Sequence, residues 1–576
     1  MTEDRGQGTV QLPGVERPQE LLSSILCPQS SDFSELRQLL ERSPGDYLAL
    51  CQLGFDRQLG GRLDEARRCY EAAMEIAPPS PELARNLGVV YWRLGDSKKA
   101  RTCLERALAL RPDALDTLDA LARVCQENGD LDAALACYEK ALRIDPRHHR
   151  AFAGMGQAFA DAGWEEDAIR AFETALTIEP DQLEASNGLG ILHKRQGRLD
   201  LALARFDHAL ALIPDDAGLQ RNRAMVLGLQ GRFGEEESAY RKILARDPGD
   251  GEAHFGLACV LLLTGRLPEG WREYEWRFAS RRDGESVRRP VSRLPRWSGE
   301  TLARESSGLI IYAEQGFGDA IQFSRFAPLA AGRFGRVRLH TRQPLLRLFE
   351  RSFGALAEVV AGTPDEQPDE HGYTHHCPLL SLPLAFGTTL ETIPAALPYL
   401  RPDAEKCRRW REVLAGESRL KVGVAWATGK RGPHRKSFEL CPSLLAPLFS
   451  GVDACWVSLN KEPLDPAQAA VLRQAGVIDR AGELKDFDDT AALVMALDLV
   501  ISVDTATAHL AGALGKPVWL LNRAESEWRW LLDRADSPWY PSMRIFRQRH
   551  IRQWEPVLAD VAIALQTMIR EHRERA

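Results

Sequence analysis

Two short segments of this chain carry side chains able to do chemistry, and each follows an apolar stretch that predicts a β-strand. The first is the run 314–319, Glu-Gln-Gly-Phe-Gly-Asp, in which Gly316 and Gly318 precede Asp319 at the expected start of a helix. An aspartate held at a strand end can take a proton from a hydroxyl group as a general base. At this spacing the same residue can instead cap the helix and compensate its dipole. The spacing alone leaves both interpretations open.

The second segment begins where the apolar run 499–503 ends in Asp504 and a further helix is expected to start. Thr505, Thr507 and His509 follow in the first turns of that helix. The first turn leaves backbone N–H groups without partners, and together with hydroxyl groups these can bind a diphosphate. A plain capped helix has the same residues. His509 is equally compatible with a buried structural histidine.

A basic loop lies between these two segments in the sequence. Residues 428–437 contain Lys430 and Lys436 and follow an expected strand at 422–427. Cationic side chains at the carboxyl end of a strand are suited to binding two phosphate groups, and a solvated surface loop is the alternative. Asn460 and Lys461 end the next expected strand, which makes them candidates for contacts with a nucleoside or its phosphates.

The elements that must position these residues are short apolar runs that alternate with helical stretches through the second half of the chain. The expected strands are 309–312, 337–340 and 358–360, followed by 422–427, 455–460, 499–504 and 517–522. This alternation predicts two parallel α/β lobes separated by a charged helical linker at 401–421. Ligands of such lobes bind outside the carboxyl ends of the strands.

The first half of the chain is built from a repeat whose markers recur every 34 residues. Proline stands at Pro44, Pro78, Pro112, Pro146, Pro180, Pro214 and Pro248, and alanine at Ala66, Ala100, Ala134, Ala168 and Ala202. Small residues stand at Gly54, Gly88, Ala122, Gly156, Gly190, Ala224 and Ala258. Small residues let two helices approach closely, and proline ends the second helix because it lacks an N–H group. Residues 45–250 therefore resemble the tetratricopeptide-repeat family, with six complete repeats and the first helix of a seventh at 251–263.

The second half, over about residues 308–553, resembles the bacterial heptosyltransferase family, glycosyltransferase family 9. The resemblance rests on the Gly318-Asp319 pair after a strand and on the segment Asp504-Thr505-x-x-x-His509 before a Gly-Lys-Pro turn. It implies a GT-B fold of two Rossmann-like lobes, with Asp319 as general base and Thr505, Thr507 and His509 beside the donor. It also implies that a lysine of the basic loop, Lys436 or else Lys430, contacts the diphosphate. The family has glycine where this chain has Ala506, so the resemblance does not determine which nucleotide-sugar is the donor.

An α-solenoid followed by a two-lobe transferase is similar to the O-linked N-acetylglucosaminyltransferases and to bacterial flagellin glycosyltransferases. The resemblance implies that a nucleotide-sugar is the substrate and that the concave surface of the repeats binds a protein acceptor such as flagellin. The sixth position of each repeat departs from the asparagine ladder of the O-linked enzymes. It reads Gln52, Asn86, Ala120, Gly154, Gly188, Asn222 and Gly256, which favours one particular partner. A glycosyltransferase acting on envelope glycans and a non-catalytic adaptor remain alternatives.

Three further patterns have structural interpretations. Asp486-Phe487-Asp488 has the D-x-D spacing with which other glycosyltransferases hold a metal ion, but it runs into an apolar helix and is interpreted as a helix start. His375, His376 and Cys377 lack further ligands at suitable spacing and predict a polar turn, not a zinc site. The tryptophan-rich run 528–540 predicts packing between the lobes, with stacking on a nucleobase or sugar as the alternative. We expect no metal and no resident cofactor.

The expected domains are a helical cap at 1–44, the solenoid at 45–280, a linker at 281–307, an acceptor-side lobe at 308–400, the linker helix, and a nucleotide-sugar lobe at 422–576. A net charge of −7 argues against a nucleic-acid partner. No apolar run reaches the ~18 residues needed to span a bilayer, and the first residues are polar. The odd number of cysteines, 11, with no C-x-x-C pair among them, indicates free thiols and fits a reducing compartment. We therefore expect a cytoplasmic protein.

Overall fold

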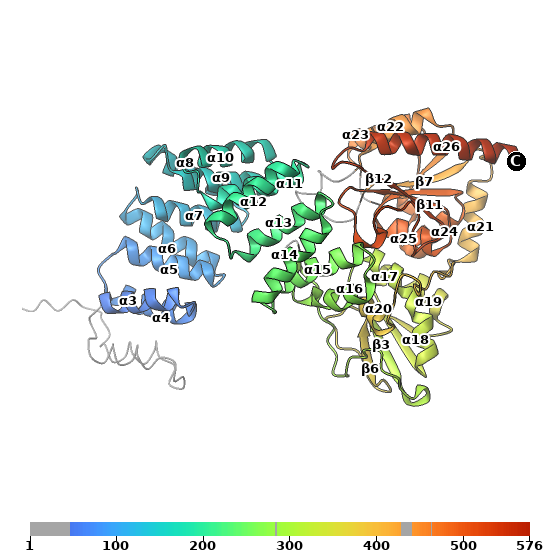
Figure 1. The fold of residues 1–576 in the computed structure, drawn as a ribbon, viewed down its shortest axis with the longest axis horizontal. Helices are drawn as coiled ribbons and strands as arrows, with labels where there is room; N and C mark the ends of the chain where they lie inside the picture. Colours follow the sequence, from blue (N-terminus) through green and yellow to red (C-terminus); the bar gives the residue numbers. More distant parts are fainter. Residues whose placement is uncertain (1–46, 283–284, 428–439, 462–463, 576) are drawn as a thin grey trace, which may run out of the picture. The chain divides into compact units, whose positions relative to one another are not determined.

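The computed structural model of the 576-residue chain describes residues 47–282, 285–427, 440–461 and 464–575 (Figure 1). Its elements fall into two compact units, one ending at Leu192 and the other beginning at His193. The second unit holds the last repeats together with all of the α/β elements. The domain ranges expected from the sequence stay predictions.

Residues 47–274 form helix pairs (Figure 1). In the first unit and across its border these are α3 Tyr47–Leu59, α4 Leu63–Ile76, α5 Pro81–Arg93, α6 Ser97–Leu110, α7 Leu115–Glu127, α8 Leu131–Ile144, α9 His149–Ala162, α10 Glu165–Ile178 and α11 Leu183–Arg195. The second unit continues with α12 Leu199–Leu212, α13 Ala217–Leu229, α14 Phe233–Arg246, α15 Gly251–Leu263 and α16 Leu267–Tyr274. The predicted first helix of a seventh repeat is confirmed, and α16 completes that pair.

The repeat markers act as their chemistry predicts. A Cβ atom at Gly88 would lie 2.8 Å from the Cγ of Leu104, so the two helices of that pair approach too closely for any larger residue. Pro112 follows the last residues of α6, where it prevents continuation of the helix. Gly129, at φ 76°, makes the left-handed turn between α7 and α8. The 34-residue pattern therefore fixes helix contact, helix end and turn.

The sixth pair departs from the pattern at Glu236, which stands where earlier repeats have alanine. Its carboxylate faces Gly228 of the preceding helix, where a Cβ atom would lie 2.3 Å from Oε2. Burial raises the pKa of Glu236 to about 8. A glutamate fits here because the opposing residue has no side chain.

The first α/β lobe contains a parallel sheet with the strand order β5-β4-β3-β6. Its strands are β3 Gly308–Tyr312, β4 Arg336–Thr341, β5 Glu358–Ala361 and β6 His375–Pro378, and its helices are α17 Phe317–Phe323, α18 Ala327–Arg333, α19 Leu346–Phe353 and α20 Leu382–Ala385. Strand β6 corrects the expected polar turn at His375, His376 and Cys377. These residues pair with β3, and Cys377 is fully buried in the hydrophobic core.

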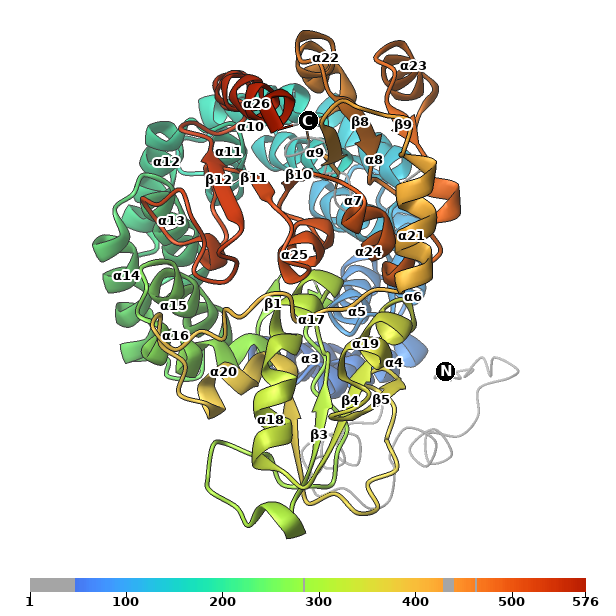
Figure 2. The same cartoon turned by 90° about the vertical axis from the view of Figure 1, so that its right-hand side faces the viewer.

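The second lobe contains a parallel sheet with the order β12-β11-β10-β7-β8-β9. Its strands are β7 Lys421–Ala425, β8 Cys455–Ser458, β9 Ile478–Asp479, β10 Leu499–Val503, β11 Val518–Asn522 and β12 Met543–Arg547. Its helices are α21 Ala404–Val413, α22 Pro442–Gly451, α23 Pro466–Gln474, α24 Phe487–Met495, α25 Ala506–Ala513 and α26 Glu555–Arg575. Helices α22, α23 and α26 lie on one face of the sheet, and α24 and α25 lie on the other (Figures 1 and 2).

One hydrophobic cluster joins the end of the repeats to both lobes. Trp271 of α16 makes edge-to-face contacts with Phe323 of the first lobe, 6.3 Å between ring centroids, and with Trp528 of the second lobe, 5.3 Å. Trp539 lies in the same cluster. The predicted interlobe packing of the 528–540 run is therefore found, and it includes the last repeat.

None of the helices in the described ranges is both long and apolar enough to cross a membrane.

Candidate functional site

Both chemistry-bearing segments lie where the order of strands reverses. In the first sheet, β3 lies between β4 and β6, so the strand order reverses at β3. The 313–319 segment begins where β3 ends. In the second sheet the reversal falls between β7 and β10, and Asp504 leaves the end of β10. Crevices outside the carboxyl ends of strands at such switch points are where open α/β sheets bind ligands.

The two segments meet in space. Helices α17 and α25 lie side by side (Figure 2), and a Cβ atom at Gly318 would lie 2.9 Å from Cδ2 of His509 and 3.6 Å from Cα of Ala506. Glycine at position 318 is therefore needed for the close approach of the two helix starts. The contact brings Asp319 of one lobe next to the start of α25 in the other.

Asp319 has two partners. One carboxylate oxygen, Oδ2, accepts a hydrogen bond of 3.0 Å from the backbone N–H of Gly316, which closes the start of α17. The other, Oδ1, pairs with the guanidinium of Arg529 from the second lobe. The side chain of Asp319 is 21% exposed, so it can be reached from solvent while it is held from two sides. The helix-cap interpretation of Asp319 therefore describes one of its two contacts.

Asp504 is enclosed more tightly. Its Oδ2 accepts a 3.0 Å hydrogen bond from the indole Nε1 of Trp530, and Nε2 of His509 lies 3.7 Å from its Oδ1. Burial, and next the negative charge of Glu527, raise the pKa of Asp504 to about 6. Its side chain retains 19% exposure. A carboxyl group with this pKa is about half neutral at pH 6 and becomes mostly ionised as the pH rises to 7.

The threonines of this segment begin helix α25. The Oγ1 of Thr505 accepts a 3.2 Å hydrogen bond from the N–H of Thr507 and lies 3.0 Å from Oγ of Ser502. Thr505 and Thr507 are partly exposed, so the start of the helix is open to one side. This arrangement has the geometry of an N-cap, in which the N–H groups of Ala508 and His509 also donate to Thr505, at its backbone carbonyl.

His509 is buried among aromatic rings. Its Nδ1 lies 2.9 Å from the hydroxyl of Tyr540, and its ring stacks on Trp530 with 5.3 Å between centroids. Burial, and next the positive charges of Arg529 and Arg325, hold the pKa of His509 well below its ordinary value. A neutral imidazole in this place serves to support the loop around Asp504.

The other predicted donor contacts lie elsewhere around the second sheet. Oδ1 of Asn460 accepts hydrogen bonds of 3.3 Å from the N–H groups of Trp426 and Ala427, which fixes the chain where β7 ends. Among the residues that the structure describes, the buried Nδ2 of Asn460 has no hydrogen-bond partner. Lys461 donates a 3.0 Å hydrogen bond to the carbonyl of Lys485. Lys430 and Lys436 lie outside the described residues.

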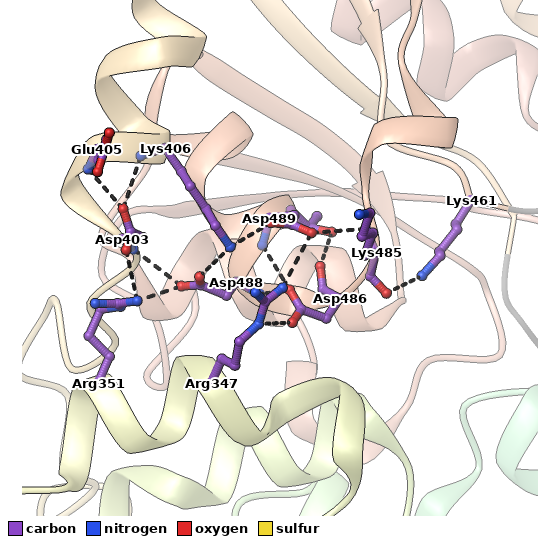
Figure 3. A network of polar contacts seen from close by, with 11 residues as sticks. Arg347, Arg351, Asp403, Glu405, Lys406, Lys461, Lys485, Asp486, Asp488 and Asp489 are labelled. Carbon is purple, nitrogen blue, oxygen red and sulfur yellow. Dashed lines mark hydrogen bonds and ion pairs between the residues drawn. The ribbon is translucent and has the colours of Figure 1, made fainter.

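The D-x-D triplet is a helix start, as predicted. Oδ1 of Asp486 accepts hydrogen bonds from the N–H groups of Asp488 and Asp489 at the start of α24. The three carboxylates also bind cations of the protein (Figure 3): Nε of Arg347 lies 2.6 Å from Asp486, and Nζ of Lys406 lies 2.7 Å from Asp488 and 2.6 Å from Asp489. Since Arg347 belongs to α19, this network joins the two lobes. Within the described part of the chain, no three His, Cys, Asp or Glu residues are grouped so as to hold a metal ion.

The loop that carries Asp319 is anchored by a buried ion pair. Nη2 of Arg277, at the end of the repeats, donates a hydrogen bond of 2.9 Å to Oε1 of Glu314. Both side chains are 0% exposed. Glu314 also accepts hydrogen bonds from the N–H groups of Leu379 and Leu380. The carboxylate thus ties together the ends of β3 and β6 and the last repeat.

Several residues of this site were not predicted from the sequence. Arg529 is 7% exposed and bonds to Asp319, to Glu527 and, through Nε at 2.7 Å, to Oε1 of Gln322. Trp530 and Tyr540 hold Asp504 and His509. The sequence signal was the tryptophan density around position 529, which indicated packing and said nothing about the arginine between the rings.

Comparison with known proteins identifies the helix pairs. Two sets of family models, both described as Tetratricopeptide repeat, match the chain: one matches residues 47–113 and 79–147, and the other matches 120–182, 166–217, 187–251 and 221–274. Residues 47–274 are tetratricopeptide repeats. The repeat assignment made from the prolines and small residues is confirmed, and the matches extend it through α16.

One curated protein is similar over a longer stretch. Protein FlbA of Caulobacter vibrioides is 30% identical over an alignment of 321 residues, which covers 52% of this chain and 52% of FlbA. The chain therefore spans about half the length of the curated relative that it matches.

Among solved structures, the chain is similar to other repeat proteins. They include a tetratricopeptide repeat protein of Parabacteroides merdae (22% identical, 40% of this chain and 92% of that chain, TM-score 0.33) and a thermophilic TPR protein of Thermus thermophilus (27%, 31% and 98%, TM-score 0.29). PilF of Pseudomonas aeruginosa is 19% identical, with 36% and 94% coverage and a TM-score of 0.31. At these TM-scores the similarity has no bearing on function.

Proposed function

We propose that this protein is a metal-independent, inverting glycosyltransferase that moves a sugar from a nucleotide-sugar to a hydroxyl group of a protein bound by the repeats. The observation that supports it most is the meeting of Asp319 with the start of α25, where Gly318 packs against His509 and Ala506. The proposed proton acceptor of one lobe then lies beside the helix start of the other lobe that is proposed to bind the phosphates of the donor. The parallel sheets, with both segments at switch points, are compatible with a GT-B transferase.

In the proposed reaction, Asp319 removes the proton from the acceptor hydroxyl as its oxygen attacks the anomeric carbon. The new carbon–oxygen bond forms as the bond to the phosphate oxygen breaks, so the configuration inverts, and the nucleoside diphosphate leaves with the electron pair. The hydroxyl groups of Thr505 and Thr507 and the positive end of the helix α25 dipole stabilise the charge on that leaving group. Lys436 or Lys430 of the basic loop is proposed to assist.

The raised pKa of Asp504 fits this role for the helix start. A fully ionised carboxylate would repel the diphosphate, whereas a carboxyl group with a pKa of about 6 is partly neutral near pH 6 and can donate a hydrogen bond. Asn460, whose buried Nδ2 has no hydrogen-bond partner among the described residues, follows strand β8, which is separated from β10 by β7, and is proposed to bind the nucleoside or a phosphate.

The acceptor is proposed to be a protein, such as flagellin, because tetratricopeptide repeats bind polypeptide segments. The repeats reach the site directly: Tyr274 of α16 donates a 3.4 Å hydrogen bond to Gln315, which lies in the loop that carries Asp319. A polypeptide bound on the last repeats would therefore end close to the proposed base.

The test uses the full chain with a panel of UDP-, ADP-, GDP- and CMP-sugars, scored first by thermal shift, since a bound donor raises stability by mass action. Transfer and donor hydrolysis are then measured with the donor that binds. Asp319→Asn is expected to keep donor binding and to lower transfer by about 10²–10⁴-fold, the usual contribution of a general base. Asp465→Asn is the matched control, because Asp465 also caps a helix, α23, through the N–H of Gln468 and is not one of the proposed site residues.

If Asp319→Asn and Asp465→Asn behave alike, Asp319 is only a helix cap and the proposed mechanism is wrong. If no donor of the panel binds or is hydrolysed, the protein is better described as a non-catalytic adaptor. Transfer to a purified envelope glycan, with none to protein, would replace the protein acceptor by a glycan.

A further inference from the structure

We propose that Arg529 is a positioning residue for Asp319, and that the turn Trp528–Trp530 couples the last repeat to both halves of the candidate active site. This inference rests on the proposed function, but its structural part can be tested without any enzyme activity. The three residues of this turn face three different partners.

The first residue of the turn contacts the repeats. The ring of Trp528 lies 5.3 Å from that of Trp271 and 5.8 Å from that of Tyr274, both edge-to-face. Trp271 is fixed in turn, because its Nε1 donates a 3.1 Å hydrogen bond to the carbonyl of Thr388 in the first lobe. Edge-to-face aromatic pairs have defined geometry, so the last repeat sets the position of Trp528.

The second residue of the turn contacts the proposed base. The guanidinium of Arg529 lies over the ring of Trp528 at 4.4 Å and reaches across the lobes to Asp319. Its Nε donates to Gln322, which lies one turn after Asp319 on α17 and has 0% exposure. A planar guanidinium with two fixed neighbours, Trp528 and Gln322, leaves little freedom to a carboxylate that it binds. Arg529 therefore sets the direction of the Asp319 side chain.

The third residue of the turn contacts the donor side. Nε1 of Trp530 donates to Asp504 at 3.0 Å, and its ring stacks on His509. A displacement of the turn would move Arg529 and Trp530 together. It would therefore also move their partners, the proposed base Asp319 and Asp504 at the start of α25. The last repeat makes the aromatic contacts with Trp528 and so supports the candidate active site. The same repeat is proposed to bring the acceptor to that site.

The structural arm of the test is amide hydrogen exchange in the full chain. Arg529→Gln is expected to speed exchange in the peptide covering residues 313–323 by about tenfold, because the charged partner of Asp319 is lost. Trp528→Phe should do the same to a smaller extent. Arg534→Gln is the matched control, since Arg534 pairs with Asp536 on the surface five residues away. Unchanged exchange in Arg529→Gln would overturn the inference, whether or not the protein proves to be an enzyme.

The kinetic arm uses the donor found by the panel. Arg529→Gln is expected to lower kcat about 10–100-fold with the donor KM changed less than about threefold, the pattern of a lost supporting contact. Arg529→Lys should recover part of kcat, because it keeps the charge but not the fork of donors. A wild-type protein that transfers sugar while Arg529→Gln keeps full kcat would refute the positioning role and leave the proposed function standing. If Arg529→Gln does not fold, Arg529→Lys and Trp528→Phe carry both measurements.

Discussion

Replacement of Asp504 by asparagine should make the protein more stable, and the gain should grow with pH. Burial raises the pKa of this carboxyl group from 3.8 to about 6. Below about pH 3 the group is almost fully neutral in both the folded and the unfolded chain and has no effect. As the pH rises through 4 to 6 the unfolded chain ionises first, so the folded chain holds more protons and the free energy of unfolding falls.

The size of the effect follows from the shift. Two pKa units correspond to about 3 kcal/mol, all of which is lost above pH 6, and about half of this is lost at pH 5. Asparagine has nearly the same shape, and its side-chain oxygen can still accept the hydrogen bond from Trp530. For a folding unit of the size of His193–Ala576, 3 kcal/mol corresponds to roughly 4 °C in the unfolding midpoint.

The assay compares Asp504→Asn with the wild type by thermal and urea unfolding at pH 5 and pH 8. The variant should unfold at higher temperature at both values, with about twice the gain at pH 8. Thr505→Ser, which keeps the hydroxyl cap of α25, serves as control and should show no pH-dependent difference. A variant less stable than the wild type at pH 8, or a gain that is equal at the two pH values, would refute the reasoning from burial.

Two further variants test other parts of the fold. Glu236→Ala restores the residue of the earlier repeats and should raise the unfolding midpoint most above pH 8, because the folded pKa of about 8 makes ionisation of Glu236 costly there. Equal midpoints of variant and wild type at pH 9 would contradict this. Arg277→Met leaves Glu314 buried without its cation and should lower the free energy of unfolding by about 3–5 kcal/mol, as measured by urea titration. Arg296→Met removes a more exposed pair with Glu275 and should lower it by less than about 1 kcal/mol, so similar losses in the two variants would contradict the role of burial.

The strands that were predicted from the sequence and those that were missed differ in their hydrophobic pattern. The apolar runs that became β3, β10 and β11 are buried on both faces, so they stand out as continuous hydrophobic segments. Strand β12, Met543–Arg547, mixes arginine with apolar residues because one of its residues is exposed, and β6 contains two histidines. Such segments become strands because their backbones pair with a neighbouring strand, β11 for β12 and β3 for β6, and not because of their own hydrophobic pattern.

The sequence by itself determined the repeats and indicated the two segments that are proposed to carry the chemistry. A 34-residue period is a local property, since each glycine, alanine and proline acts on helices within its own unit or the next one, and Gly318-Asp319 and Asp504-Thr505 are each contiguous. These patterns needed no knowledge of distant contacts.

Only the tertiary structure decided what surrounds those segments. Arg529 lies 210 residues from Asp319, and Arg277 lies 37 residues before Glu314, so no period or motif connects them. The same holds for the basic partners of Asp486 and Asp488, which gather from α19 and α21 (Figure 3). A charge buried in the folded chain must find its partner wherever packing places one, because the cost of leaving it unpaired depends on three-dimensional burial and not on sequence separation.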